Sequence, residues 1–494
     1  MKLKYFKLFL LASGILAVSS CKKQLDINYD PDRLPDGNSP IEQLLTSAQV
    51  NLGFEGGSDL FRYTTLIMQH MSGGASQPNQ TYEYYRHNIT GSDMNNVWGS
   101  IHATTLSDLE LIIKQGGASP YFVGIAKILK AYEYALVVDV WGDVPYSQAQ
   151  QLTGNTQPAY DDDATIYPKL ITLLTDAVTD LNASSSVLTP GAASLMYTGA
   201  YATIKANWIK LANTLRLRLL LHYSKVNPAF CVAQITALVN TAGITFMASN
   251  ADNFQMNFYN VANQRSPISA FEVSRPNYLF ADARMLSLMN AKSDPRRATY
   301  FTDFPLGSGT YVGVSATALP PVPNNNYSRI HTFLRGAVTT PAVGINSAVY
   351  SGAAPQRMLP YAEYCFIRAE AALMGAPGNA QTFFTDGITA SMQEAGVAAG
   401  NITTYLTANG TLTGTNAQKL QQIIEEKYIA LFGVSVEPWN DWRRTGYPAL
   451  SSPSNSITGA IPRTLFYPQS EIDLNPNNPG QKGANLQSTV FWDN

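Results

Sequence analysis

The sequence contains none of the short catalytic motifs that can be recognised from spacing alone. G-x-S-x-G, H-E-x-x-H, G-x-x-x-x-G-K and C-x-x-C are all absent. No histidine lies close enough in sequence to another to form a local pair of metal ligands; the five are His70, His87, His102, His222 and His331. A zinc site or a histidine-based triad would have to be assembled by the fold. We therefore predict no catalytic residue, no metal and no cofactor.

A catalytic pair of carboxylates is harder to recognise in a sequence than these motifs, because a glycoside hydrolase needs only two such residues. Glu363 and Glu370 are seven residues apart in a predicted helix, about 10 Å along its axis and on one side. A retaining pair needs about 5 Å, so the spacing fits poorly. Glu425 and Glu426 point to different helix faces. We interpret all four as salt-bridge partners or solvated residues. A secreted carboxylate-dependent glycoside hydrolase is the less favoured alternative.

Three consecutive aspartates, Asp161, Asp162 and Asp163, precede a predicted helix that begins near Ala164. Negative side chains suit a helix N-terminus, because its first amide groups have no partner within the helix. We predict a capping role for this run. Calcium binding is the alternative, although the sequence lacks the Asp-x-Asp-x-Asn-Gly loop that is typical of such sites.

Aromatic residues in charge-poor segments are the positive signal for ligand binding. A tyrosine ring stacks on the apolar face of a sugar or on a peptide bond while its hydroxyl hydrogen-bonds nearby, and asparagine amides both donate and accept. The alternative is that the rings fill gaps between loops and helices. We predict that residues 82–85 and the loops around 311 and 327 share one exposed face. The candidate ligand-binding residues are Tyr82, Tyr84, Tyr85, Tyr278, Tyr311, Asn325 and Tyr327.

The elements that must hold these residues are mostly helices. Apolar residues recur at helical spacing in residues 121–140, 166–181, 203–223, 361–374 and 416–432. Such amphipathic helices at intervals suggest stacked helical hairpins of the tetratricopeptide kind, although no strict repeat of about 34 residues occurs. We predict a mostly α fold with a loop-rich face that contains short strands.

Between these helices lies a loop-rich region of about residues 241–356, part of which is almost free of charge. From residue 303 to residue 356 the charged residues are Asp303, Arg329 and Arg335. Disordered segments carry more charge and fewer Val, Ile, Tyr and Phe residues. We predict ordered loops and short strands laid over the helices, where ligand sites commonly lie.

The N-terminus has the pattern of an export signal. Lys2, Lys4 and Lys7 precede an apolar run over residues 8–18 that is too short to span a bilayer. The sequence Val-Ser-Ser-Cys that ends at Cys21 is similar to the bacterial lipobox. We predict a lipoprotein signal peptide over residues 1–20, lipidation at Cys21, a tether over 21–40 and a single domain over 41–494.

Composition excludes some partners. The 494 residues contain 33 Lys+Arg and 35 Asp+Glu, a net charge of -2 at pH 7, whereas a nucleic-acid binder needs a basic face. A charged fraction of 14% leaves a surface suited to neutral, hydroxyl-rich or peptide-like ligands. We predict that Cys231 and Cys365 act as small buried hydrophobes, with a single cross-link between them as the alternative.

Eight short motifs occur in order along the chain. They are CKKQLDIN at 21–28, WGDVPY at 141–146, NWIKLANTLRLRL at 207–219, DPR at 294–296, YAE at 361–363, AEA at 369–371, WNDWRR at 439–444 and YPQSE at 467–471. Together they resemble the SusD/RagB-like family of nutrient-binding outer-membrane lipoproteins of Bacteroidetes. Two positions depart from the family pattern: Ala200 and Tyr201 replace an expected Gly-Asp pair, and Thr464 to Phe466 lack a usual arginine.

The resemblance implies a non-catalytic protein that is lipid-anchored at the cell surface. Such a protein sits on a TonB-dependent, SusC-like outer-membrane transporter and delivers an oligosaccharide to it, or in some relatives a peptide. The motif residues belong to the scaffold, so the resemblance assigns no binding residue. We expect a glycan-binding protein of this kind, with a peptide-binding member of the same family as the alternative.

Overall fold

The computed structural model describes residues 39–73, 79–151, 154–314, 327–343 and 347–494. Helices make up 55% of the described residues and strands 6%, so the predicted mostly α fold is confirmed. The predicted signal peptide, Cys21, nearly all of the tether and Asn325 lie outside the described residues.

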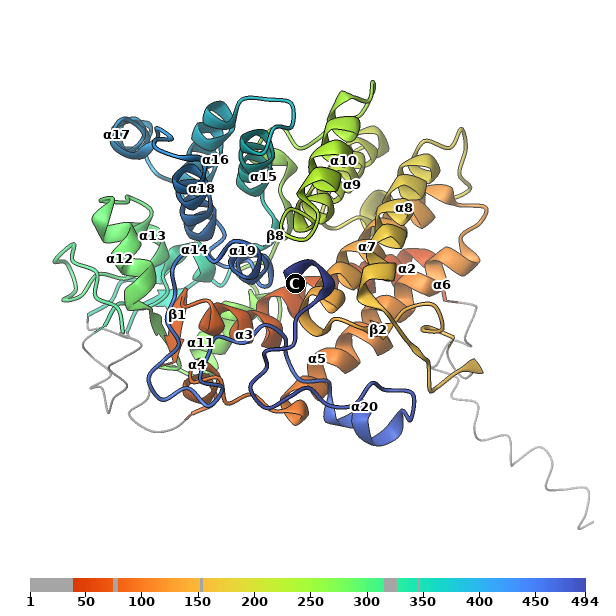
Figure 1. Cartoon of the computed structure of the whole chain (residues 1–494), viewed down its shortest axis with the longest axis horizontal. Helices are drawn as coiled ribbons and strands as arrows, with labels where there is room; N and C mark the ends of the chain where they lie inside the picture. The colour runs from red at the N-terminus through yellow and green to blue at the C-terminus, as the bar shows by residue number, and fades with distance from the viewer. Residues whose placement is uncertain (1–38, 74–78, 152–153, 315–326, 344–346) are drawn as a thin grey trace, which may run out of the picture.

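Paired helices form an arc that crosses the right and the top of Figure 1. Each pair packs against the next, and the arc ends with two helices that both contact α16. In order, its members are α2 (Ile41–Gly57) with α6 (Leu106–Gln115), α7 (Pro120–Trp141) with α8 (Asp163–Leu181), α9 (Tyr201–His222) with α10 (Pro228–Asn240), α15 (Tyr361–Leu373) with α16 (Ala380–Glu394), and finally α17 (Ala399–Asn409) and α18 (Asn416–Ala430).

The helix α7 shows how the sequence specifies these elements. Pro120 occupies its first turn, where the missing amide hydrogen costs nothing, and Gly142 ends it with φ +79°, which favours glycine. Its predicted apolar stripe is buried, and burial of each such side chain contributes about 1.5–3 kcal/mol. The stripe consists of Ile125, Ile128, Leu129, Tyr132, Leu136 and Val140.

The aspartate run begins α8 as predicted. The Asp162 carboxylate accepts a hydrogen bond from the Thr165 amide at 3.2 Å and caps the helix. Asp161 accepts from the Ser147 amide at 2.8 Å, and Asp163 accepts from the Phe491 amide at 2.8 Å. Each carboxylate therefore has a partner within the protein.

Short helices lie at the left, at the centre and along the bottom of Figure 1, and the described residues form four two-stranded antiparallel ladders. The ladders are β1 (Met71–Gly73) with β5 (Leu279–Ala281), β2 (Val144–Pro145) with β3 (Tyr160–Asp161), β4 (Phe254–Met256) with β8 (Gln356–Leu359), and β6 (Val338–Thr340) with β7 (Val349–Tyr350). The helices are α3 (Asp59–Ile67), α4 (Gln80–Tyr85), α5 (Asn95–Gly99), a π-helix (Ser100–Thr105), α11 (Pro267–Ser274), α12 (Ala283–Ala291), α13 (Arg297–Tyr300), α14 (Thr332–Arg335), α19 (Glu437–Thr445) and α20 (Gln469–Leu474). The predicted loops and short strands between residues 303 and 356 are present in its described part.

The two cysteines outside the predicted signal region are packing residues. Cys231 and Cys365 are both buried and free, so the alternative of a cross-link between them is wrong. Burial raises the pKa of each thiol to about 12, and both stay protonated at neutral pH. In the part of the chain that the structure describes, no helix combines the length and the apolar character that crossing a bilayer requires.

Candidate ligand-binding site

The carboxylates considered as a catalytic pair are neutralised inside the helical arc. Glu363 is 0% exposed and Glu370 is 2% exposed. Arg218 of α9 donates hydrogen bonds of 2.6 and 2.7 Å to Glu363, and Arg444 of α19 donates one of 2.8 Å to Glu370. Glu363 is enclosed, and Glu370 lines a groove of about 480 Å³ with its carboxylate held by Arg444. The prediction that these residues are salt-bridge partners is confirmed.

Glu426 has the same structural role farther along the arc. Lys292 Nζ lies 2.7 Å and Arg296 Nη2 lies 2.9 Å from its carboxylate oxygens. Burial opposes ionisation, but these two cations lower the pKa of Glu426 to about 2. Glu425, its neighbour in sequence, is only half-buried.

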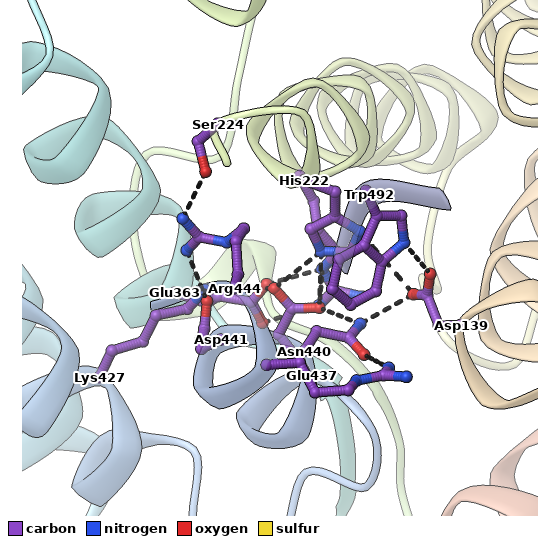
Figure 2. A network of polar contacts seen from close by, with 12 residues as sticks. Asp139, His222, Ser224, Glu363, Lys427, Glu437, Asn440, Asp441, Arg444 and Trp492 are labelled. Atoms are coloured by element: carbon purple, nitrogen blue, oxygen red, sulfur yellow. Dashed lines mark hydrogen bonds and ion pairs between the residues drawn. The ribbon is translucent and has the colours of Figure 1, made fainter. Parts of the chain in front are cut away.

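A buried polar network joins the arc to α19 and to the C-terminal segment (Figure 2). Lys427 of α18 donates to Glu437 at 3.2 Å and to Asp441 at 2.9 Å. Asp139 of α7 accepts from the Trp492 indole at 3.0 Å. All five side chains are buried. The network therefore holds elements together and has no open surface for a substrate.

The candidate tyrosines gather instead around the β1–β5 ladder. Because β1 pairs with β5, Tyr278, directly before β5, lies beside α4, which follows β1. The Thr81 hydroxyl donates a hydrogen bond to the Tyr278 carbonyl. Gly73 permits α4 to lie close against β1, since a Cβ at that position would lie 2.1 Å from the Thr81 carbonyl oxygen.

Two further segments lie against the same ladder. The Ala281 amide donates to the Ser328 carbonyl at 3.0 Å, and the Ser328 amide donates to the Val312 carbonyl at 2.8 Å. The Tyr327 ring meets Phe280 of β5 edge to face, with centroids 6.2 Å apart. Segments that contain Tyr82, Tyr278, Tyr311 and Tyr327 therefore converge, although they are far apart in sequence.

Burial divides the predicted residues into two groups. Tyr82, Tyr278, Tyr311 and Tyr327 are half-buried, so part of each side chain reaches the surface. Tyr84 and Tyr85 are 2% and 0% exposed, and their predicted role in ligand contact is wrong.

The reason for this error is that residues 80–85 form a helix. The Asn79 side chain caps α4 by accepting from the Tyr82 amide at 3.0 Å, so successive rings point in different directions. The Tyr84 hydroxyl donates to Asp93 at 2.9 Å, and the Tyr85 hydroxyl donates to Asp282 at 2.8 Å. Both rings thus complete the core.

Two adjoining hollows lie in the same region, and of the four tyrosines Tyr311 lines one of them. The larger has a volume of about 250 Å³ and is lined by Tyr311, Asp303, His331 and apolar side chains that include Phe301 and Leu306. The smaller has a volume of about 40 Å³. Both hollows share Thr302, Ala348 and Tyr350. We call the four half-buried tyrosines and the two hollows the loop face.

Polar groups at the hollows come from residues that the sequence analysis did not assign. His331 Nδ1 lies 2.8 Å from the Tyr350 hydroxyl, and burial, with a smaller effect of Arg335, lowers the pKa of His331, so the imidazole is neutral at pH 7. The Arg335 guanidinium lies 3.9 Å from the centroid of the Tyr350 ring. The Arg329 guanidinium lies 3.5 Å from the centroid of the Phe280 ring.

One sequence signal could have identified the two arginines: they stand isolated in a segment that is otherwise nearly free of charge. Glu272, which lines the smaller hollow, comes from the separate helix α11, and nothing in its sequence neighbourhood marks it. Within the described residues, no group of three or more His, Cys, Asp or Glu side chains could hold a metal ion. The loop face offers rings, neutral hydrogen-bonding groups and two guanidinium groups.

Comparison with known proteins identifies the family. The SusD-like family model described as "Starch-binding associating with outer membrane" matches residues 35–468. The chain belongs to this family. No curated protein matches the sequence.

Solved structures of SusD-like proteins share this fold. A protein described as chitin-binding is 26% identical, with a TM-score of 0.74 over 92% of this chain and 100% of its own. A chitin-binding SusD homologue from Flavobacterium johnsoniae is 22% identical, with a TM-score of 0.72 over 92% and 98%. A SusD homologue from Bacteroides uniformis is 23% identical, with a TM-score of 0.71 over 91% and 99%.

Proposed function

We propose that this SusD-like protein is a non-catalytic, lipid-anchored protein of the cell surface. It binds an oligosaccharide at the loop face and delivers it to a TonB-dependent outer-membrane transporter. The observation that carries the proposal is that the segments containing Tyr82, Tyr278, Tyr311 and Tyr327 converge, and that Tyr311 lines a hollow of about 250 Å³.

The chemistry of the loop face suits a sugar. Partly exposed rings can stack on the apolar face of a pyranose, and a stacked ring contributes about 0.5–1.5 kcal/mol beyond its buried area. His331 and the Tyr350 hydroxyl offer neutral hydrogen-bonding groups close to the rings. The family's description as starch-binding and the chitin-binding description of a relative that is 26% identical agree with such a ligand.

The absence of catalysis is proposed because hydrolysis of a glycosidic bond requires two carboxyl groups that flank it. The candidate carboxylates Glu363, Glu370 and Glu426 instead form ion pairs with two buried arginines and a half-buried lysine. Asp303 lines the larger hollow and Glu272 lines the smaller one. The test for turnover therefore includes a substitution of each.

The experiment is isothermal titration of the purified protein with maltohexaose and chitohexaose, extended to a glycan array, with product analysis after long incubation. We expect saturable binding of at least one neutral or charged glycan class and no cleavage. Turnover that is lost on Asp303→Asn or Glu272→Gln would show a hydrolase. Binding of peptides from a mixed library, with no glycan bound, would support the peptide alternative and contradict the proposal.

A further inference from the structure

The smaller hollow of the loop face holds more positive than negative charge. Arg329, Arg335 and Glu272 line it together with Asn277 and Tyr350. Glu272 and Arg329 are buried and Arg335 is half-buried, so solvent screens their charges less than on an open surface. Two guanidinium groups thus face a single carboxyl group.

Arg335 has donors that the protein does not use. Its guanidinium is held over the Tyr350 ring, and within the described residues no carboxylate lies within ion-pair distance of it. Its Nε atom is buried without a hydrogen-bond partner. A buried donor that stays unpaired costs about 1–3 kcal/mol, and an arginine fork matches the geometry of a carboxylate.

Glu272 neutralises this charge only in part. Its Oε1 atom is buried without a hydrogen-bond partner. Burial raises the pKa of Glu272 to about 7, although Arg335 and Arg329 act in the opposite direction. At neutral pH the carboxyl group is therefore protonated in part of the molecules. The other titratable groups nearby are Tyr350, which both hollows share, and Asp303 and His331 in the adjoining hollow.

The sizes of the two hollows fit two parts of one ligand. One water needs about 10–15 Å³ of cavity volume, so a hollow of about 40 Å³ admits a carboxylate but no sugar ring. The adjoining space of about 250 Å³ beside Tyr311 is large enough for a ring. Thr302, Ala348 and Tyr350 form the boundary between them.

We propose that the loop face selects oligosaccharides that contain a uronic acid: the sugar carboxylate enters the smaller hollow and accepts hydrogen bonds from Arg335, while the sugar ring lies in the larger hollow beside Tyr311. This inference rests on the proposed function and names the substrate class of the same site.

The test uses matched ligands. Oligogalacturonate, oligomannuronate and hyaluronan oligosaccharides are each titrated beside the carboxyl-reduced counterpart, which differs only in carrying CH2OH in place of the carboxylate. For at least one pair we expect the acidic form to bind about tenfold or more tightly. Arg335→Gln should abolish this preference, and Arg335→Lys, which keeps the charge, should retain part of it. Arg216→Gln removes a half-buried arginine of α9 in another groove and should leave the preference unchanged.

Two results would overturn the inference and leave the proposed function intact. One is equal binding of the acidic and reduced forms, and the other is a preference for the acidic form that persists in Arg335→Gln. Binding of peptide C-termini in place of any glycan would overturn both. If Arg335→Gln lowers the melting temperature, the acidic and reduced ligands are compared on the unsubstituted protein and on Arg335→Lys. That comparison still shows whether the loop face prefers the carboxylate.

Proton uptake gives a second readout. A carboxylate bound beside Glu272 favours the protonated form of Glu272, so affinity for the acidic ligand should rise several-fold between pH 8 and pH 6, where a uronate with a pKa of about 3.5 stays ionised. Glu272→Gln should flatten this profile. A profile that is equally steep in Glu272→Gln would contradict the assignment.

Discussion

At the scale of single residues, exposure separates the tyrosines that can meet a ligand from those that hold the fold. Tyr311 lines the larger hollow and lies under the Arg297 guanidinium at 5.3 Å. Tyr85 is 0% exposed and hydrogen-bonds to Asp282. The two residues are of one type and differ only in where the fold places them, so their replacement should affect different measurements.

We predict that Tyr311→Ala weakens oligosaccharide binding by about tenfold, because a stacked ring contributes on the order of 1 kcal/mol and its lost contact area adds to this. Tyr85→Ala should instead destabilise the protein by about 3–5 kcal/mol through loss of a buried ring. Titration calorimetry and urea unfolding separate the effects. Tyr201→Ala, a half-buried ring on α9, is the binding control. Unchanged affinity in Tyr311→Ala would remove this tyrosine from the site.

Residue type and spacing predicted some side-chain roles and missed others. Asp162 was identifiable as a cap because the rule is local to one helix end. The burial of Tyr84 and Tyr85 depends on where α3 and Asp282 lie, and the hollow around Arg335 depends on α11, α14 and β7 meeting. Such roles are set by tertiary contacts, which one sequence does not reveal.

At the scale of elements, buried charges connect helices that are distant in sequence. Lys427 of α18 is 0% exposed and contacts Glu437 and Asp441 of α19. Although burial disfavours its charged form, Asp441 and Glu437 raise the pKa of Lys427. The ammonium group therefore stays charged and neutralises two buried carboxylates.

Lys427→Met should leave those carboxylates without their cation and cost about 3–5 kcal/mol of the free energy of unfolding. Lys419→Met, at a half-buried position near the start of the same helix, should change it by less than about 0.5 kcal/mol. Urea denaturation followed by circular dichroism measures both. A loss below about 1 kcal/mol in Lys427→Met would show that the network contributes little to stability.

The junction of α2, α7 and the π-helix contains two carboxyl groups. Ser100 and Thr105 of the π-helix donate to Glu55 of α2 at 2.6 and 2.8 Å. Burial, and then the neighbouring Glu55, raise the pKa of Glu133 of α7 well above its ordinary value. Glu133 is thus uncharged in the folded protein at pH values where the unfolded chain ionises it.

This shift destabilises the protein as the pH rises from about 4.5 towards the folded-state pKa, because ionisation then favours the unfolded chain. We predict that Glu133→Gln is more stable than the parent by more than about 1 kcal/mol at pH 8, and that the difference shrinks towards pH 5. Melting temperatures across this range are the readout, with Glu42→Gln of α2 as control. Parallel profiles for Glu133→Gln and the parent would contradict the assignment.

At the scale of the whole molecule, apolar periodicity predicted α7, α8, α9, α15 and α18 of the arc, since each of these helices buries apolar residues at helical spacing. It did not predict α2, α6, α10, α16 and α17. Eight motifs in order identified the SusD-like family, and the family model over residues 35–468 confirms it. The loop face could not be predicted in this way, because its segments have no apolar periodicity. Its form depends on pairing of segments more than 200 residues apart, such as β1 with β5.

Lipid anchoring remains a prediction from the sequence Val-Ser-Ser-Cys that ends at Cys21. Cys21→Ser should move the protein from the membrane fraction to the soluble fraction without changing its melting temperature, because the described core is built from residues 41 onward. Fractionation and immunoblotting of cells that express each form provide the measurement. Equal retention of both forms in membranes would exclude a lipid tether at this residue.

The central claim is that the loop face binds a glycan and leaves it intact. The most direct measurement is a crystal structure of the complex with the tightest-binding oligosaccharide from the titrations. We predict an uncleaved oligosaccharide against Tyr311, with further contacts among Tyr82, Tyr278 and Tyr327. An oligosaccharide seated on the helical arc, such as the groove between α8 and α9, or found as cleaved products, would contradict the account.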